Sequence, residues 1–130
     1  MRVIVTGARN WRDVDLIRDR LSKLMPQLPH LPEDIVIVHG AASGADAIAH
    51  DCALRFGYTP EPHWPKYAWC ESRNEIAEAP KARNQKMVDL GANLCLAFPT
   101  KGSRGTWDMV KRAELARIPV EVISNVKDPS

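Results

Sequence analysis

Apolar residues follow two different spacings along the chain, and the two spacings alternate. Five short apolar runs, several of them rich in β-branched residues, predict strands. Between these runs, apolar residues recur every three or four positions, which is typical of amphipathic helices. The predicted strands lie at residues 3–7, 35–38, 58–64, 93–99 and 120–124, and the predicted helices at 14–25, 45–56, 81–90 and after the turn 100–106.

Two segments depart from this regular alternation. Residues 65–80 carry aromatic side chains among many charges without a clear period, which predicts a long surface loop or a lid with one short helix. The run 58–64 contains two prolines, so we expect it at the edge of a sheet, where a missing N–H donor does little harm. Gly57 is placed to end the helix 45–56.

Strands that alternate with helices predict an α/β fold, because consecutive parallel strands need a crossover connection. We expect a three-layer sandwich in which helices cover both faces of a mostly parallel five-stranded sheet. A length of 130 residues fits one domain, which we place at 1–124, followed by a flexible C-terminal tail at 125–130. In open parallel sheets, ligands bind beyond the carboxyl ends of the strands.

The charge of the chain is nearly balanced. Lys and Arg number 18, Asp and Glu number 16, and no block of like charges occurs. This composition gives no sign of nucleic-acid or membrane binding. No apolar stretch approaches 18 residues and the N-terminus lacks the pattern of a signal peptide, so we expect a soluble, cytoplasmic protein.

Two glycine-containing turns lead from predicted strands into predicted helices. The first, "HGAASGAD", spans residues 39–46, and the second, "GSRGT", spans residues 102–106. Glycine lets the backbone approach a ligand closely, and free N–H groups at a helix N-terminus favour an anion such as phosphate. Such turns also serve close packing alone, but two of them facing one crevice favour binding. The chain has no G-x-G-x-x-G after its first strand and no P-loop motif, so a conventional dinucleotide dehydrogenase or P-loop NTPase is not expected.

Other side chains add hydrogen-bond donors and aromatic surface near the same edge of the predicted sheet. Arginine suits phosphate or carboxylate groups, and Trp64 either shields a ligand or packs a loop. The predicted ligand-binding residues are Gly7, Arg9, Gly40, Ser43, Gly44, Asp46, Trp64, Arg83, Asn84, Gly102, Ser103, Arg104, Gly105 and Thr106.

The sequence predicts no metal and no cofactor. His39 and His63 each lie at a predicted strand end, but neither has partners at metal-ligand spacing. Asp46 and Asp108 are the carboxylates that the motifs place nearest the crevice, and they are the candidate catalytic residues. Two interpretations of Asp46 stay open: it balances the helix dipole in the first turn, or it has a catalytic or ribose-binding role.

Five motifs, "TGARNW", "HGAASGAD", "HW", "ARNQKM" and "GSRGTWDM", occur in this order over residues 1–123. Together they closely resemble the YspA/YpsA-related branch of the SLOG superfamily. This Rossmann-like group also includes the Lonely Guy phosphoribohydrolases and the DNA-processing protein DprA. The resemblance implies a Rossmann-like domain that binds a nucleotide or a nucleotide-derived ligand across the glycine turns.

Lonely Guy enzymes cleave the N-glycosidic bond of nucleoside monophosphates with a P-G-G-x-G-T-x-x-E motif and an Arg-Lys pair. The resemblance places Gly102, Gly105 and Thr106 in the phosphate-binding part of that motif. It makes Arg83 the counterpart of the arginine.

The departures from this motif affect catalysis. Ser103 stands where the second glycine falls, and Met109 stands where the glutamate falls. Asp108 lies one residue earlier, a direction about 100° away around a helix. The segment "EAPKARN" also lacks the Ala-Gly-Pro that usually precedes the Arg-Asn pair, here Arg83 and Asn84, in the YspA-like branch.

The sequence therefore supports competing functional hypotheses. Intact glycine turns without the glutamate favour a module that senses or sequesters a nucleotide-derived small molecule. The alternative is a nucleotide N-glycosidase in which Asp46 or Asp108 supplies the carboxylate and Arg83 holds the phosphate. A DprA-like nucleic-acid partner is a third class, which is favoured by the resemblance and by Trp64, Tyr67 and Trp69, whose rings could stack bases, and disfavoured by the small net charge. A homodimer is compatible with the fold, because related folds often pair through helices.

Overall fold

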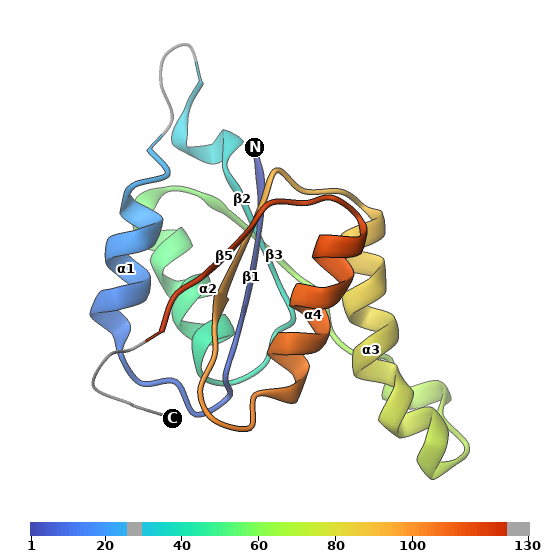
Figure 1. The fold of residues 1–130 in the computed structure, drawn as a ribbon. Helices are drawn as coiled ribbons and strands as arrows, with labels where there is room; N and C mark the ends of the chain where they lie inside the picture. The colour runs from blue at the N-terminus through green and yellow to red at the C-terminus, as the bar shows by residue number, and fades with distance from the viewer. Residues whose placement is uncertain (26–29, 125–130) are drawn as a thin grey trace.

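The computed structural model describes residues 1–25 and 30–124, and the predicted tail at 125–130 lies outside this part of the chain. Five strands form one sheet in the order β3-β2-β1-β4-β5, and helices connect them (Figure 1). The strands are β1 (Arg2–Gly7), β2 (Val36–His39), β3 (Thr59–Pro62), β4 (Leu94–Phe98) and β5 (Val120–Val122). The helices are α1 (Val14–Ser22), α2 (Ala45–Phe56), α3 (Arg73–Asp89) and α4 (Arg104–Leu115), with short 3-10 helices η1 (Pro32–Asp34) and η2 (Tyr67–Trp69).

The predicted three-layer α/β sandwich is confirmed, and every strand pair is parallel. Helices α1 and α2 cover one face of the sheet, and α3 and α4 cover the other (Figure 1). Alternate residues of the central strand β1 point to opposite faces. Val3 and Val5 therefore join the core under α1 and α2, whereas Ile4 joins the core under α3 and α4. The carboxyl ends of all five strands consequently meet at one edge.

Strand β3 is an edge strand, as its two prolines predicted. It pairs with β2 alone, and the N–H groups of Thr59 and His63 donate to carbonyls of Ile35 and His39. Pro60 and Pro62 occupy the alternate positions of the strand. Because donors alternate in direction along a strand, the missing N–H groups fall on the open edge, where no partner strand needs them.

Helix boundaries follow turn chemistry. Helix α2 ends at Gly57 as predicted, and this glycine adopts the left-handed conformation with φ of 78°. Helix α1 is shorter than predicted, because Lys23 and Leu24 bond back to carbonyls in the last helical turn and close it. Within the described residues, no helix combines the length and the apolar character needed to cross a membrane.

The interpretation of residues 65–80 as a long loop is wrong, because helix α3 begins at Arg73 and passes through Pro80. The Ser72 hydroxyl caps its start by accepting from the Glu75 N–H at 3.1 Å, and the Glu75 carboxylate accepts from the Glu71 N–H at 3.0 Å. The sequence "SRNE" has the capping-box pattern, but here the glutamate accepts from Glu71, one residue before the N-cap Ser72. The first half of α3 extends away from the sheet (Figure 1), so its residues are exposed and show no apolar period. The alternative of a lid with one short helix is not what the structure has either: residues 67–69 form the 3-10 helix η2, and residues 73–80 belong to the 17-residue helix α3.

Candidate functional site

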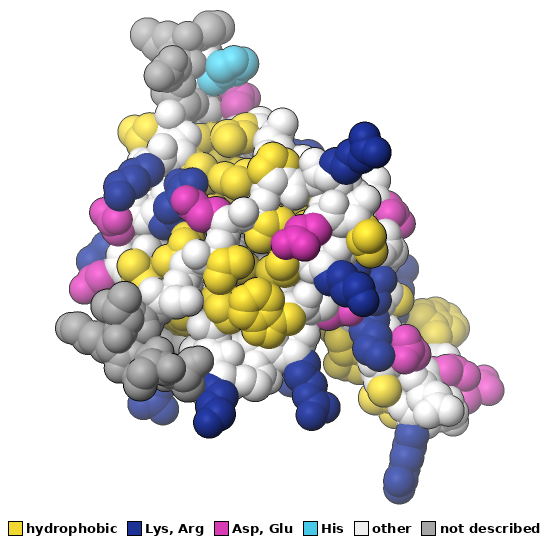
Figure 2. Space-filling model, in the orientation of Figure 1, with side chains coloured by type: hydrophobic (Ala, Val, Ile, Leu, Met, Phe, Trp, Pro, Cys, Tyr) yellow, Lys and Arg dark blue, Asp and Glu magenta, His cyan; other side chains and the backbone are white. Residues whose placement is uncertain are grey.

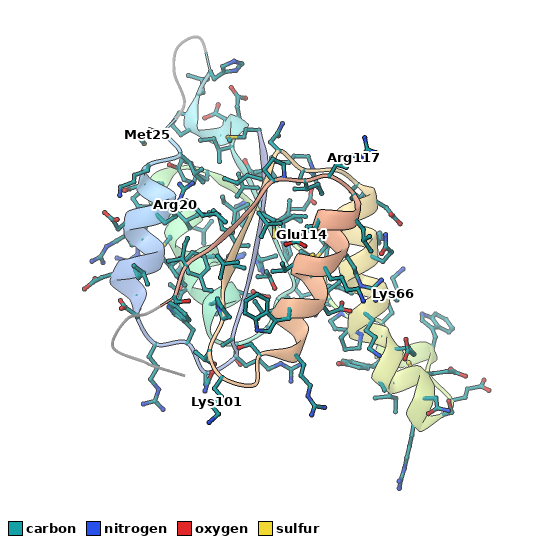
Figure 3. All side chains as sticks on the ribbon, viewed as in Figure 1. Arg20, Met25, Lys66, Lys101, Glu114 and Arg117 are labelled. Atoms are coloured by element: carbon teal, nitrogen blue, oxygen red, sulfur yellow. The ribbon has the colours of Figure 1, made fainter. Side chains whose placement is uncertain are left out.

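A cavity of about 550 Å³ opens at the carboxyl edge of the sheet, a volume typical of small-molecule sites. Loops after β1, β2 and β4 form its floor, and α3 and α4 contribute walls. Figure 2 shows Lys and Arg side chains protruding at this end of the molecule. Lys101 lies there, where β4 leads into α4 (Figure 3).

Most of the predicted site residues line this cavity, and three do not. Ser43, Gly44 and Trp64 are absent from its wall, and the Trp64 side chain is 67% exposed. The predicted residues that meet at the cavity are Gly7, Arg9, Gly40, Asp46, Arg83, Asn84, Gly102, Ser103, Arg104, Gly105, Thr106 and Asp108.

The N-terminus of α4 offers unused backbone donors to the cavity. In the part of the chain that the structure describes, the N–H groups of Gly105 and Thr106 donate to no carbonyl. The preceding turn is fixed, since Ser103 Oγ donates to the Thr100 carbonyl at 2.8 Å and accepts from the Thr100 N–H at 2.7 Å. Free N–H groups at a helix start carry partial positive charge. This end of the cavity is suited to an anion.

Gly44 has a packing role. Its φ is +73°, and a Cβ atom built there would lie 2.3 Å from the Ala8 carbonyl oxygen. The next residue, Ala45, donates its N–H to the same oxygen at 3.1 Å, and Ser43 Oγ donates to the Arg9 carbonyl at 3.3 Å. The turn before α2 therefore packs directly on the loop after β1, and only glycine fits at residue 44.

Gly40 allows the Arg83 side chain to reach the sheet edge. A Cβ atom at Gly40 would lie 2.6 Å from Nη1 of Arg83. That nitrogen donates to the carbonyls of Gly40 and His63, and Nε donates to Asn84 Oδ1 at 3.0 Å. Burial lowers the pKa of Arg83, although Asp46 opposes the shift. The guanidinium is thus held against the cavity wall by neutral oxygens.

Asp46 is buried at the start of α2, with 5% of its surface exposed. Its Oδ2 accepts from the N–H groups of Gly40 at 3.0 Å and Ala42 at 3.3 Å, so the side chain occupies donors of the first glycine turn. Oδ1 is a buried atom without a hydrogen-bond partner among the described residues. Burial raises the pKa of Asp46 to about 6, against the opposing effects of the two N–H groups and of Arg83.

Asp108 has the opposite environment. Burial disfavours its charge, but hydrogen bonds from Arg112 Nε at 2.8 Å and Asn84 Nδ2 at 3.0 Å outweigh burial, and the pKa of Asp108 is lowered. Met109, at the position of the family's glutamate, is 1% exposed and packs in the core under α3 and α4. Among the carboxylates of α4, Asp108 is therefore the one that lines the cavity.

His39 and His63 belong to separate hydrogen-bond networks. His39 Nδ1 accepts from the Ala41 N–H at 3.0 Å, and its Nε2 lies 2.9 Å from His50 Nδ1. Burial, reinforced by His50, lowers the pKa of His39 to about 4. His63 Nε2 lies 2.8 Å from the Glu61 carboxylate. Within the described residues, no group of three or more His, Cys, Asp or Glu side chains is placed to hold a metal ion.

Sequence reasoning missed several residues of the cavity wall. Asn10 lies three residues after β1 and Thr100 two residues after β4, and Thr100 Oγ1 donates to Asn10 Oδ1 at 2.9 Å, joining the two loops. Their position after strands was a usable signal. Pro80 comes from the part of α3 that was interpreted as a loop, and Lys81 begins the segment 81–90 that was predicted as a helix. Lys101 also lines the cavity.

Three comparisons with known proteins agree with this geometry. The family model described as "YspA, cpYpsA-related SLOG family" matches residues 1–66. Gene 61 protein of Mycobacterium phage D29 is 40% identical over 124 residues, which cover 92% of this chain and 93% of the phage protein. The X-ray structure of DNA processing protein A (DprA) from Streptococcus pneumoniae has the same fold, with a TM-score of 0.72 and 19% identity. That match covers 98% of this chain and 52% of DprA, so the chain spans about half the length of DprA. By its sequence, the chain belongs to the YspA, cpYpsA-related SLOG family.

Proposed function

We propose that the protein binds a nucleotide-derived small molecule in this cavity, with a phosphate group at the N-terminus of α4. The observation that carries the proposal is the pair of unused N–H donors at Gly105 and Thr106, two residues that line the cavity at the start of α4. Lys101 and Arg104 line the same end and add positive charge. Phosphate is the ligand group that such a helix start suits best.

Membership of the SLOG family supports a nucleotide as the carrier of that phosphate. The shape of the site supports a small molecule, because the cavity is a concave space between two helices and the sheet edge. The exposed aromatic residues Trp64 and Trp69 lie outside the cavity wall. A base stacked on them would be separate from the anion site, which disfavours a nucleic-acid partner.

A second candidate function is hydrolysis of an N-glycosidic bond. It is favoured by two carboxyl groups on one cavity whose pKa values move in opposite directions, upward for Asp46 and downward for Asp108. Cleavage of a glycosidic bond commonly uses one carboxyl group that holds a proton and one that is ionised. Asp46 would supply the acid and Asp108 the carboxylate that stabilises positive charge on the sugar.

One experiment separates the two functions. The purified protein is incubated with nucleoside 5′-monophosphates, NAD and ADP-ribose, freed of unbound compound, denatured and analysed by liquid chromatography and mass spectrometry. Recovery of one compound unchanged and near stoichiometric supports binding. Release of free base that Asp46→Asn or Asp108→Asn abolishes supports hydrolysis, and release that both variants retain in full refutes that assignment. If the protein neither retains any of these compounds nor releases free base from one of them, the proposed function is refuted.

A further inference from the structure

Asp46 and Arg83 meet over the bare backbone of Gly40. A Cβ atom built on Gly40 would lie 3.1 Å from Asp46 Oδ2 and 2.6 Å from Arg83 Nη1. Yet no ion pair within 4 Å joins the two side chains in the described part of the chain. Each is instead held by backbone groups, so opposite charges lie near each other without pairing.

Each side chain also has hydrogen-bonding capacity that its neighbours leave unused. Asp46 Oδ1 is buried and unpartnered among the described residues. The bonds that Arg83 makes use Nε and Nη1, and no bond of the described residues uses Nη2. Both residues belong to the cavity wall. A buried carboxylate oxygen without a partner costs free energy, and a ligand that supplies a donor removes this cost.

The chemistry of this pair narrows the group that it accepts. A cationic group would attract Asp46 but repel Arg83, and an anionic group would attract Arg83 but repel Asp46. A hydroxyl satisfies both, since its O–H donates to the carboxylate while its oxygen accepts from the guanidinium. In nucleotides, the sugar hydroxyls are the groups of this kind nearest the phosphate.

We propose that Asp46 and Arg83 form a sugar-hydroxyl subsite that makes the cavity selective for ribonucleotides over their deoxy forms. The inference rests on the proposed function, because it takes the phosphate to lie at the start of α4. Acidic side chains that bind ribose hydroxyls are known in other nucleotide-binding α/β folds.

The sheet topology gives the two subsites a suitable separation. Gly40 follows β2 and the turn before α4 follows β4, and β1 lies between these two strands. Neighbouring strands are about 4.8 Å apart, so the two loops start about 10 Å from each other. A sugar phosphate with a hydrogen bond at each end spans a distance of this size.

The test compares ribonucleoside 5′-monophosphates with their 2′-deoxy and 3′-deoxy analogues by isothermal titration calorimetry. The wild-type protein is expected to bind the ribonucleotide about tenfold more tightly than at least one analogue, the size expected for a hydrogen bond to a charged group. Asp46→Asn is expected to reduce this difference to about twofold or less. Asp51→Asn, which removes an exposed carboxylate from the same helix, is expected to keep it.

The outcomes separate this inference from the proposed function. Equal affinity of the wild-type protein for ribo and deoxy compounds overturns the hydroxyl subsite and leaves phosphate binding intact. A tenfold difference that persists in Asp46→Asn overturns the assignment to Asp46. Absence of binding by every compound refutes the proposed function itself. If Asp46→Asn unfolds at a clearly lower temperature than wild type, Arg83→Lys is the second variant. A loss of affinity in Arg83→Lys that is equal for ribo and deoxy compounds would contradict the hydroxyl subsite.

Discussion

Replacing Asp46 with Asn is expected to change how the stability of the fold depends on pH. Burial raises the pKa of Asp46 from its ordinary value of 3.8 to about 6. Between these two values the folded state keeps a proton that the unfolded state releases, so stability falls as pH rises. Each pKa unit corresponds to about 1.4 kcal/mol, so ionisation of Asp46 costs the folded state about 3 kcal/mol by pH 7.

His39 acts in the opposite direction over nearly the same range. Its pKa is lowered from 6.5 to about 4, because burial and the neighbouring His50 disfavour the charged imidazole. The unfolded state therefore binds the proton first as pH falls, and stability rises by about 3 kcal/mol between pH 4 and pH 7. In the wild-type protein, the contributions of Asp46 and His39 to the pH dependence of stability largely cancel. Replacing one of the two residues leaves the contribution of the other visible.

The assay is urea unfolding at pH 4, 5, 6 and 7 for the wild-type protein, Asp46→Asn and His39→Asn. The free energy of unfolding of Asp46→Asn, relative to wild type, is expected to increase by about 2–3 kcal/mol from pH 4 to pH 7. For His39→Asn the same difference is expected to decrease by about 3 kcal/mol. Asp51→Asn controls for the change in net charge. If the free energy of unfolding of Asp46→Asn relative to wild type does not vary with pH, burial does not raise the pKa of Asp46 in the folded protein.

Two further predictions concern turns that position the site. Gly44→Ala is expected to lower the free energy of unfolding by at least about 2 kcal/mol, because it combines a left-handed backbone with a Cβ atom 2.3 Å from the Ala8 carbonyl; a wild-type thermal midpoint would contradict the packing role of this glycine. Ser72→Ala removes the cap of α3 and is expected to cost about 1 kcal/mol. Amide hydrogen exchange in residues 73–79 is expected to become faster in Ser72→Ala, while exchange in α4 stays slow. Unchanged exchange in residues 73–79 would show that Ser72 does not stabilise the start of α3.

The alternation of strands and helices could be predicted because burial imposes it. Strand β4 is buried on both faces and reads as a continuous apolar run, and α2 has one apolar face and a glycine at its end. The first half of α3 could not be predicted from periodicity, because it extends from the body and buries no apolar stripe. Its capping residues, Ser72 and Glu75, could have indicated the start of the helix. Pro80 argued against a helix there, because proline usually ends one.

Only part of the cavity wall could be predicted, because tertiary contacts decide which residues of a turn face the cavity. Sequence identifies glycine at a strand end but does not distinguish a backbone that approaches a ligand from one that packs on another loop. Gly40 and Gly44 lie in one motif, yet Gly40 admits Arg83 to the cavity wall whereas Gly44 packs on the loop after β1. The position of Asp46 over Gly40 also depends on tertiary contacts, since its partners are backbone N–H groups of the preceding turn.

Gly105→Trp tests whether the start of α4 holds the phosphate group of the ligand. Gly105 lines the cavity, and a Cβ atom there meets nothing within 4 Å, so a tryptophan fits beside the proposed anion site without straining the backbone. Glu114→Trp, at an exposed position toward the other end of the same helix, is the matched control (Figure 3). Ribonucleoside 5′-monophosphates are titrated into each protein by calorimetry after melting curves verify the fold. We predict that at least one compound binds the wild-type protein and Glu114→Trp with equal affinity. The same compound is expected to bind Gly105→Trp at least about tenfold more weakly. Equal affinity of the wild-type protein and Gly105→Trp for every compound would show that the phosphate does not lie at the start of α4.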